Sequence, residues 1–389
     1  CSSDLAVVDA QALYTKPMCA DSLTALKNAA NIAKAETDPT KLLDEIAAVT
    51  GCIKAANSSI NTYATLTSYM AYSKQITDSL KRTSGAAAYA TSYNEIEGKI
   101  SIGSYQDSEI PAAIIAAKTA TGKYLMSDIT NASSTDPADV TFVIQNADFA
   151  KNTSTGWTIS TSDASYSGAA NYQCFEIWNR SFNIGQTLYG MPEGTYKLTT
   201  QAYYRDGTNS GLVDSVANNK YGLNAKIYIN NATGNIMPIT DGAIDTTGTK
   251  CPTSGLYMFN SVNKYYQPNS MQTAAFWFDS LAVGQKYIAN ETYNFVTTEV
   301  GADANGVITI GAKKTLKVND DWTIFGGFKL YYLGNTSGIE NTSANTSSVV
   351  SSKIYGINGA QSNKLMKGIN IVKSTLSDGT VKVQKVLVK

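Results

Sequence analysis

Aromatic rings and planar polar groups occur together in one stretch of this chain, residues 171–207. A flat ring can pack against the apolar face of a pyranose, while carboxylate, amide and guanidinium groups can bind its hydroxyls. Two further rings, from a later segment, could close over this stretch. The eight candidate ligand-binding residues are Tyr172, Glu176, Trp178, Asn179, Tyr204, Arg205, Tyr265 and Tyr266. This pattern predicts non-catalytic binding of an oligo- or polysaccharide.

Some of these rings could instead belong to a hydrophobic core. Trp157, Trp277 and Trp322 lie in strand-like patterns and are predicted to be core residues, whereas Trp178 fits either role. In the pair Tyr203-Tyr204, the period of two along a strand sends one ring inward and the other outward.

Catalysis is the weaker interpretation. The chain has no histidine, which excludes Ser-His-Asp triads, Cys-His dyads and His-ligated zinc. Glycoside hydrolysis would need two carboxylates about 5–10 Å apart. Glu176, Asp206, Asp279 and Glu291 could supply them, but no local spacing supports such a pair. We therefore predict no catalytic residue.

The charge balance and the lack of long apolar runs argue against a nucleic-acid partner and against a membrane span. Lys and Arg total 31, and Asp and Glu also total 31, so there is no basic surplus to bind a nucleic acid. No apolar run approaches the ~18 residues of a membrane span. A glycan is the predicted partner. The alternative is an adhesin or structural protein of the cell surface whose sheet contacts other proteins.

The elements around the candidate residues read as strands. Residues 195–204 alternate between apolar and polar side chains, which predicts a strand with one wet face. The residues Met191-Pro192-Glu193-Gly194 have the composition of a turn. A second strand is predicted at 182–190. Together these features predict a β-hairpin.

Before this region, apolar residues recur at helical spacing. Helices are predicted from Ala20, from the Asp38-Pro39 cap to Cys52, from about Ile60 to Leu80, from Ser84 to Ile100, and from about Ser108 to Met126. Residues 1–18 read as an irregular leader. The stripes predict an antiparallel helical bundle over residues 1–130.

After residue 138 the period changes to two. This change predicts an antiparallel β-sandwich over residues 138–335. Its strands are expected near 141–147, 156–161, 173–179, 182–190, 195–205, 222–230, 273–278, 286–298, 306–317 and 322–333. A polar linker at 336–352 and a small β module at 353–389 should follow.

Five cysteines leave one over if the others pair. Cys19 begins one predicted helix and Cys52 ends the next, so their ends would meet in an antiparallel hairpin. We predict the disulfides Cys19–Cys52 and Cys174–Cys251. Cys1, followed by Ser-Ser-Asp, resembles the lipidated first residue of a mature bacterial lipoprotein. The alternatives are an arbitrary start of the sequence or an internal pairing of Cys1.

Three segments carry a resemblance to a known family. They are the run QTLYGMPEGTYKLT at 186–199 with the following AYYRDG, the pair Asp148-Phe149 with Gly156-Trp157, and the run DWTIFGGFKLYYLG at 321–334. They resemble galactose-binding-like, carbohydrate-binding-module-like β-sandwiches of surface and secreted proteins of Bacteroidota. The resemblance implies a jelly roll and an extracellular location. Related sandwiches often hold a structural Ca²⁺, so Ca²⁺ could bind here, with no other cofactor expected. The family often has Asp-Asn where this chain has Gly326-Gly327.

The C-terminal module carries a second resemblance. Ile354-Tyr355, Lys367-Gly368-Ile369 and the terminal KVLVK resemble the sorting tail of type IX secretion substrates. Either a lipid on Cys1 or such a tail would place the protein at the outer-membrane cell surface. Contact with a membrane is expected only through the lipid anchor.

Overall fold

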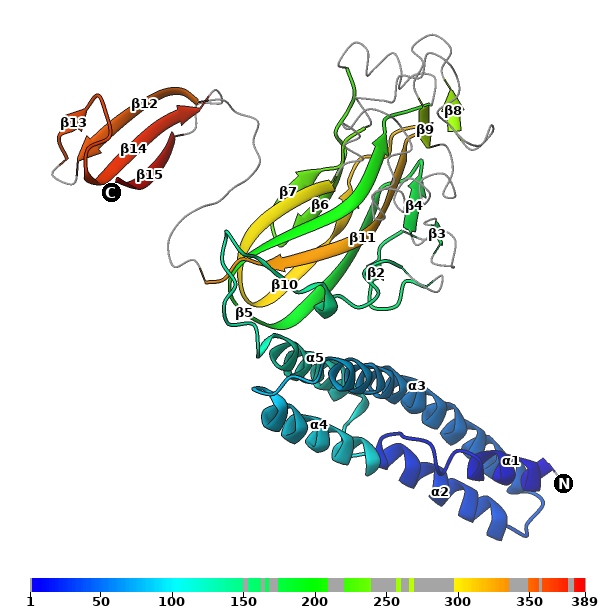
Figure 1. The fold of residues 1–389 in the computed structure, drawn as a ribbon. Helices are drawn as coiled ribbons and strands as arrows, with labels where there is room; N and C mark the ends of the chain where they lie inside the picture. The colour runs from blue at the N-terminus through cyan, green and yellow to red at the C-terminus, as the bar shows by residue number, and fades with distance from the viewer. Residues whose placement is uncertain are drawn as a thin grey trace.

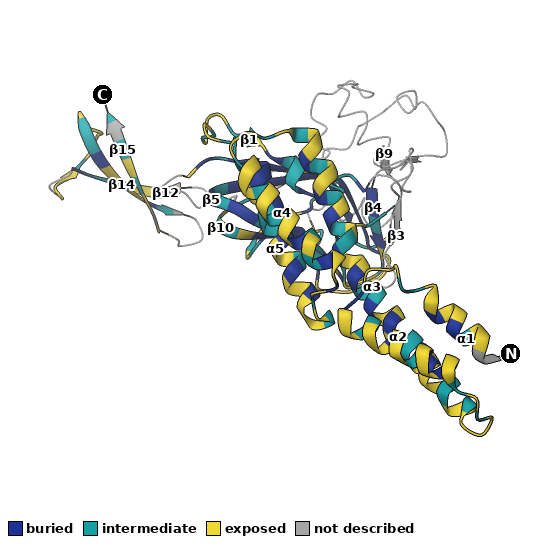
Figure 2. Cartoon of the chain, turned by 90° about the horizontal axis from the view of Figure 1, so that it is seen from below, coloured by how far each residue is buried: buried dark blue, intermediate teal, exposed yellow. Residues whose placement is uncertain are grey.

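The computed structural model describes residues 2–149, 153–161, 165–167, 174–208, 220–238, 257–259, 266–268, 297–335, 349–356, 359–376 and 381–388. Within them the chain forms five α-helices and two main antiparallel sheets, with the helices N-terminal to the larger sheet and the smaller sheet at the C-terminus (Figure 1). In Figure 2 the helices carry exposed residues on their outer faces, while the strands of the larger sheet are mostly buried. None of the described helices combines the length and apolarity needed to cross a membrane.

The helices pack through the predicted apolar stripes. They are α1 (Ser2–Gln11), α2 (Ala20–Ala35), α3 (Leu42–Leu80), α4 (Ala86–Ser101) and α5 (Ile110–Met126). One cluster joins α1 and α2 to the first half of α3, and another joins the rest of α3 to α4 and α5. The predicted irregular leader is wrong, because Val7 and Ala10 of α1 are buried in the first cluster.

The longest helix, α3, replaces two predicted helices. It has 39 residues, which at ~1.5 Å per residue spans about 58 Å. The predicted break near Cys52 does not occur, since the sequence from Cys52 to Ile60 holds no proline or glycine that would end a helix. The helix ends at Leu80, and the capping residue Lys81 has a φ of 49°, in the left-handed region.

Cys19 and Cys52 are both free thiols, so the predicted bridge between them is wrong. The backbone N–H of Cys19 donates to Ser59 Oγ at 2.9 Å. Ser59 lies two turns beyond Cys52 on α3, a separation of about 10 Å along the helix axis. Because Cys52 lies within a helix rather than at its end, the expected meeting of helix ends does not occur. The other predicted bridge, Cys174–Cys251, includes a residue outside the described part of the chain.

The larger sheet has nine strands with the order β3-β4-β11-β5-β10-β6-β7, while β1 pairs with β11 and β2 pairs with β5. All of its pairings are antiparallel. The strands are β1 (Ala138–Asp139), β2 (Thr158–Ile159), β3 (Ser165–Ser167), β4 (Cys174–Trp178), β5 (Phe182–Arg205), β6 (Ala225–Ile229), β7 (Ala232–Asn235), β10 (Thr297–Lys314) and β11 (Trp322–Tyr332).

The predicted hairpin at 182–205 is wrong, because β5 is one continuous strand of 24 residues. Both of its halves pair with β10, whose register shifts on either side of Gly306, opposite the Met191–Gly194 segment. Gly190, Gly194 and Gly306 all have positive φ angles, of 72°, 152° and 77°. Pro192 lies in this irregular segment, where a missing N–H is tolerated. The residues at 191–194, which have the composition of a turn, therefore mark a bend that β5 shares with its partner strand β10.

The bend folds the sheet over a single core. Phe182 begins β5, and Phe325 lies opposite Ala202 near its other end. The Phe182 and Phe325 rings nevertheless stack with centroids 6.1 Å apart. A straight strand of this length would separate those ends by about 65 Å. Side chains of both halves of β5 thus meet in one hydrophobic cluster, as a two-layered arrangement requires.

Other predicted strands differ in detail. Residues 141–147 begin with a 3-10 turn, Thr141–Val143, rather than a strand. Its flanking residues Val140 and Ile144 are both buried, which explains the strand-like pattern. The predicted strand at 273–278 lies outside the described residues, as does the predicted strand at 286–298 except for its last two residues, which begin β10. Before them in the sequence, β8 (Tyr257–Phe259) and β9 (Tyr266–Pro268) form a separate antiparallel pair.

The C-terminal segment forms a four-stranded antiparallel sheet with the order β13-β12-β14-β15. Its strands are β12 (Val349–Gly356), β13 (Gln361–Ser362), β14 (Gly368–Leu376) and β15 (Val381–Val388). The side chain of Asn370 is buried and bonds to the backbone of Met366 and Gly368.

The bundle meets the larger sheet through α5 and β5. Glycines at the contact, Gly122 on α5 and Gly190 on β5, let the two backbones approach closely. Met126 continues the contact, because its side chain is part of the core of the sheet.

Candidate functional site

Tyr204, which was predicted to bind ligand, lies instead in the hydrophobic core. Its side chain is fully buried, and its hydroxyl lies 3.1 Å from Asp321 Oδ2 and 3.2 Å from Asp206 Oδ1. The neighbouring ring of Tyr203, on the other face of the sheet, is buried as well. Alternation sends the two rings to opposite faces, but both faces are covered here. Tyr204 is therefore not available as a sugar platform.

Arg205 is also buried, and protein groups hold its guanidinium. Its Nε donates to the carbonyl of Gly207 at 3.1 Å, and its Nη2 donates to the carbonyl of Asp320 at 3.3 Å. The guanidinium lies 5.5 Å from the centroid of the Trp322 ring. Burial lowers the pKa of Arg205 from its ordinary value. These contacts give Arg205 a structural role and contradict the prediction that it binds ligand directly.

Among the predicted ligand-binding residues that the structure describes, Trp178 has an exposed ring, with 55% of its surface accessible. It lies opposite Trp322 on the neighbouring strand, and Trp322 lies opposite Arg205. Glu176, two residues before Trp178 and thus on the same face, accepts a 2.8 Å hydrogen bond from Trp322 Nε1. Burial raises the pKa of Glu176, and this hydrogen bond opposes the rise. One ring and one carboxylate of the prediction thus remain together at this face.

The other predicted residues contribute less. Asn179 has a φ of 54°, and its buried Oδ1 has no hydrogen-bond partner among the described residues. Tyr172 and Tyr265 lie outside the described part of the chain, and for Tyr266 only its place in β9 is described. The predicted eight-residue site is therefore only partly assembled by the described structure.

A hollow of about 350 Å³ lies elsewhere, between α3 and α4 and over α5. We call it the tyrosine pocket. Its lining residues come from all three helices and are Lys74, Thr77, Asp78, Ala86, Tyr89, Ala90, Tyr93, Asn94 and Tyr124. Its volume falls within the range of small-molecule sites.

Helical spacing explains why α4 forms one wall of this pocket. Ala86, Ala90 and Asn94 recur every four residues and so share one face of the helix. Tyr89 and Tyr93 follow the same spacing beside them, with ring centroids 5.7 Å apart. Tyr124 of α5 adds a third ring, 5.0 Å from that of Tyr89. The two alanines leave the space that the three rings border.

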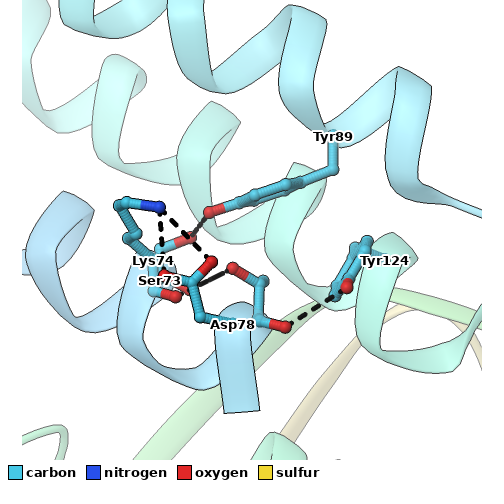
Figure 3. Close-up of polar contacts among 6 residues, drawn as sticks. Ser73, Lys74, Asp78, Tyr89 and Tyr124 are labelled. Carbon is cyan, nitrogen blue, oxygen red and sulfur yellow. Dashed lines mark hydrogen bonds and ion pairs between the residues drawn. The ribbon is translucent and has the colours of Figure 1, made fainter. Parts of the chain in front are cut away.

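Hydroxyl contacts hold two of these rings in place (Figure 3). The hydroxyl of Tyr89 lies 2.8 Å from Ser73 Oγ, which lies 2.7 Å from Thr121 Oγ1. Tyr124 donates to the carbonyl of Thr77 at 3.2 Å. Because these hydroxyls are engaged with α3, the rings are fixed before any ligand arrives.

The charges at the rim of the pocket are balanced. Lys74 and Asp78, one turn apart on α3, form an exposed ion pair at 3.0 Å (Figure 3). Burial raises the pKa of Tyr93 to about 12, so its phenol is neutral at physiological pH. The pocket thus offers aromatic surface, one amide and paired charges, a set that suits an uncharged polar ligand.

No group of three or more Cys, Asp or Glu side chains in the described part of the chain is arranged to hold a metal ion. The structural Ca²⁺ stays a prediction. No protein-family model, curated protein or solved structure matches this chain significantly.

Sequence reasoning missed the tyrosine pocket. The sequence feature that could have indicated it is a double repeat in α4. Tyr89 and Tyr93 are four residues apart, and so are the small residues Ala86 and Ala90 beside them. Apolar stripes of helical period predict a core, and that pattern alone does not distinguish the tyrosines of α4 as a surface.

Proposed function

We propose that this protein binds neutral saccharides without cleaving them, as a surface or secreted carbohydrate-binding protein. The observation that carries the proposal is the tyrosine pocket, a hollow of ligand size with three aromatic walls. A pyranose presents an apolar face to such rings and hydroxyls to groups such as the amide of Asn94. The pairing of Lys74 with Asp78 favours an uncharged ligand over an ion.

The folded sheet offers a second place for the same ligand class. Trp178 supports it, because its exposed ring lies on the same face as the carboxylate of Glu176. We also infer that this sheet is a galactose-binding-like jelly roll. The resemblance of residues 186–199 and 321–334 supports that inference, as does the way β5 and β10 bend over one core.

Display at the bacterial cell surface is part of the proposal. It rests on the resemblance of residues 353–389 to a sorting tail, and the antiparallel sheet of β12–β15 is compatible with it. Deleting this segment should leave the protein inside the producing cell, whereas unchanged export would remove that support.

A glycan array with the full chain, followed by calorimetry on any hit, tests the proposal. Ala90→Phe should fill the tyrosine pocket and abolish binding. Ala88→Phe is the matched control, since Ala88 is exposed and lies about 200° around the helix from Ala90. Trp178→Ala tests the sheet independently.

The three variants separate the outcomes. Loss of binding in Ala90→Phe alone supports the tyrosine pocket, and loss in Trp178→Ala alone moves the site to the sheet. Silence of the wild-type chain across a broad array would refute saccharide binding and favour the adhesin alternative.

A further inference from the structure

Lys314 and Asp321 form a buried pair that saccharide binding does not use. Lys314 ends β10 and Asp321 immediately precedes β11. Both side chains are completely buried, and Lys314 Nζ directly contacts Asp321 Oδ2. Two opposite charges at such a position lose their hydration, which their mutual attraction offsets only in part. Burial therefore shifts both groups toward their uncharged forms.

The hydrogen bonds around Tyr204 also indicate an uncharged carboxyl group. The Tyr204 hydroxyl accepts from Asn224 Nδ2 at 3.1 Å and lies within hydrogen-bond distance of carboxyl oxygens of Asp321 and Asp206. A phenol has a single proton to donate. It can donate to only one of the two carboxyl groups at a time, so a full hydrogen bond with the other requires that carboxyl group to donate its own proton. In that arrangement one of the two aspartates is a neutral acid.

Burial identifies which one. It raises the pKa of Asp321 and lowers the pKa of Lys314, and the contact between the two groups opposes both shifts. Asp206, by contrast, is only half-buried and accepts a further 2.5 Å hydrogen bond from the backbone N–H of Gly222. These contacts are satisfied when Asp321 donates to Tyr204 and Tyr204 donates to Asp206.

A neutral amine in contact with a neutral carboxylic acid is a pair that can condense. We propose that Lys314 and Asp321 are joined by an intramolecular isopeptide bond between Nζ and Cγ, closing the turn between β10 and β11.

The atoms balance without an oxidant or co-reactant. Nζ attacks Cγ of Asp321 and forms the C–N bond. One Nζ proton is transferred to Oδ2, with Tyr204 and Asp206 as the relay, and the C–Oδ2 bond breaks to release water. Oδ1 remains as the amide oxygen. In the described structure Oδ1 has no hydrogen-bond partner, so it is not held by a group that would compete with this change.

Intact-mass measurement of the denatured full chain tests the proposal. The chain should be lighter than its sequence by the mass of one water. Lys314→Met and Asp321→Ala should each restore the unmodified mass.

Tryptic mapping of the wild-type chain locates the bond without relying on any variant. Lysines at 313, 314, 317 and 329 define the fragments. A bond at Lys314 should prevent cleavage there and join residues 314–317 to 318–329 in one branched peptide. Recovery of 318–329 as a free linear peptide, with the unmodified intact mass, would establish an ordinary ion pair and overturn the proposal.

The variant Asp206→Asn tests the proposed role of Asp206 in proton transfer, independently of whether the isopeptide bond exists. We expect a folded chain, by circular dichroism, in which the branched peptide forms about 10²–10⁴-fold more slowly, the usual contribution of a positioned proton-transfer group. Formation at the wild-type rate would remove Asp206 from the proposed step.

Discussion

The carbonyl oxygen of Tyr189 on β5 lies where a side chain on Gly122 of α5 would have to be, since an ideal Cβ on Gly122 would come within 1.8 Å of it. The helix and the strand therefore meet backbone to backbone. Gly190 completes the fit from the other side, because a Cβ there would lie 2.3 Å from the carbonyl oxygen of Thr119.

Gly122→Ala should destabilise the chain by about 1–3 kcal/mol or more, because the backbone of β5 must move to admit the methyl group. Denaturant unfolding followed by circular dichroism measures the change. Gly98→Ala is the matched control, since a Cβ at Gly98 in α4 meets nothing within 4 Å. Replacing that helical glycine should stabilise the chain by about 0.5–1 kcal/mol. Equal effects of the two substitutions would contradict the close contact.

Tyr204→Ala should cost about 3–5 kcal/mol, because it removes a fully buried ring. Trp178→Ala should change stability by no more than about 0.5 kcal/mol, since it removes an exposed one. Thermal unfolding of both variants gives the comparison. A Tyr204→Ala protein as stable as wild type would return Tyr204 to the list of exposed binding candidates.

Cys52 should react with an alkylating reagent faster than Cys19 in the native chain. Cys52 is partly accessible, whereas Cys19 is 3% exposed and its thiol lies 3.5 Å from Gln106 Oε1. Peptide mass mapping after timed labelling measures both rates. If neither thiol were alkylated until the chain had been reduced, the two cysteines would instead form the disulfide that the structure lacks.

Asp128 should make stability depend on acidic pH. Its side chain accepts hydrogen bonds from the backbone N–H groups of Thr83 and Ser84 at 2.9 and 3.0 Å. The side chain of Ser84, followed by these backbone groups, lowers the pKa of Asp128 to about 2. Because the folded pKa lies below the ordinary value, the stabilisation is complete above about pH 5 and is lost as the pH falls toward 2.

Asp128→Asn provides the comparison, since the amide keeps the shape but does not titrate. The stability difference between wild type and variant should be constant above about pH 5 and should shrink below it. A difference that stays unchanged down to pH 2 would rule out the proposed hydrogen-bond contribution of the carboxylate.

Local patterns predicted the existence of most elements well. Leu26, Leu66 and Met70 lie on apolar stripes of helical period, and all three are buried as expected. The alternation of residues 195–204 correctly predicted a strand. These successes have one physical cause, which is that periodicity records which face of an element is buried.

Connections between elements were harder to predict, because their chemistry is ambiguous. Pro192 and Gly194 suit both a hairpin turn and a bulge, and only the partner strand β10 distinguishes the two. Cys52 seemed to end a helix because the apolar stripe thins after Ile53, although the backbone there remains helical. The burial of Tyr203 and Tyr204 depends on what covers each face of the sheet, which alternation alone does not specify.

The place where the helices attach has a mechanical consequence. Helix α5 contacts β5 at Gly190, and from Tyr196 to Thr199 that same strand is paired on both sides, with β10 and with β11. A pull transmitted through the bundle would therefore enter an interior strand of the sheet. Extracting that strand would require the hydrogen bonds to both neighbouring strands to break together. This arrangement resists force far better than an edge strand, whose bonds to one neighbour can break one after another.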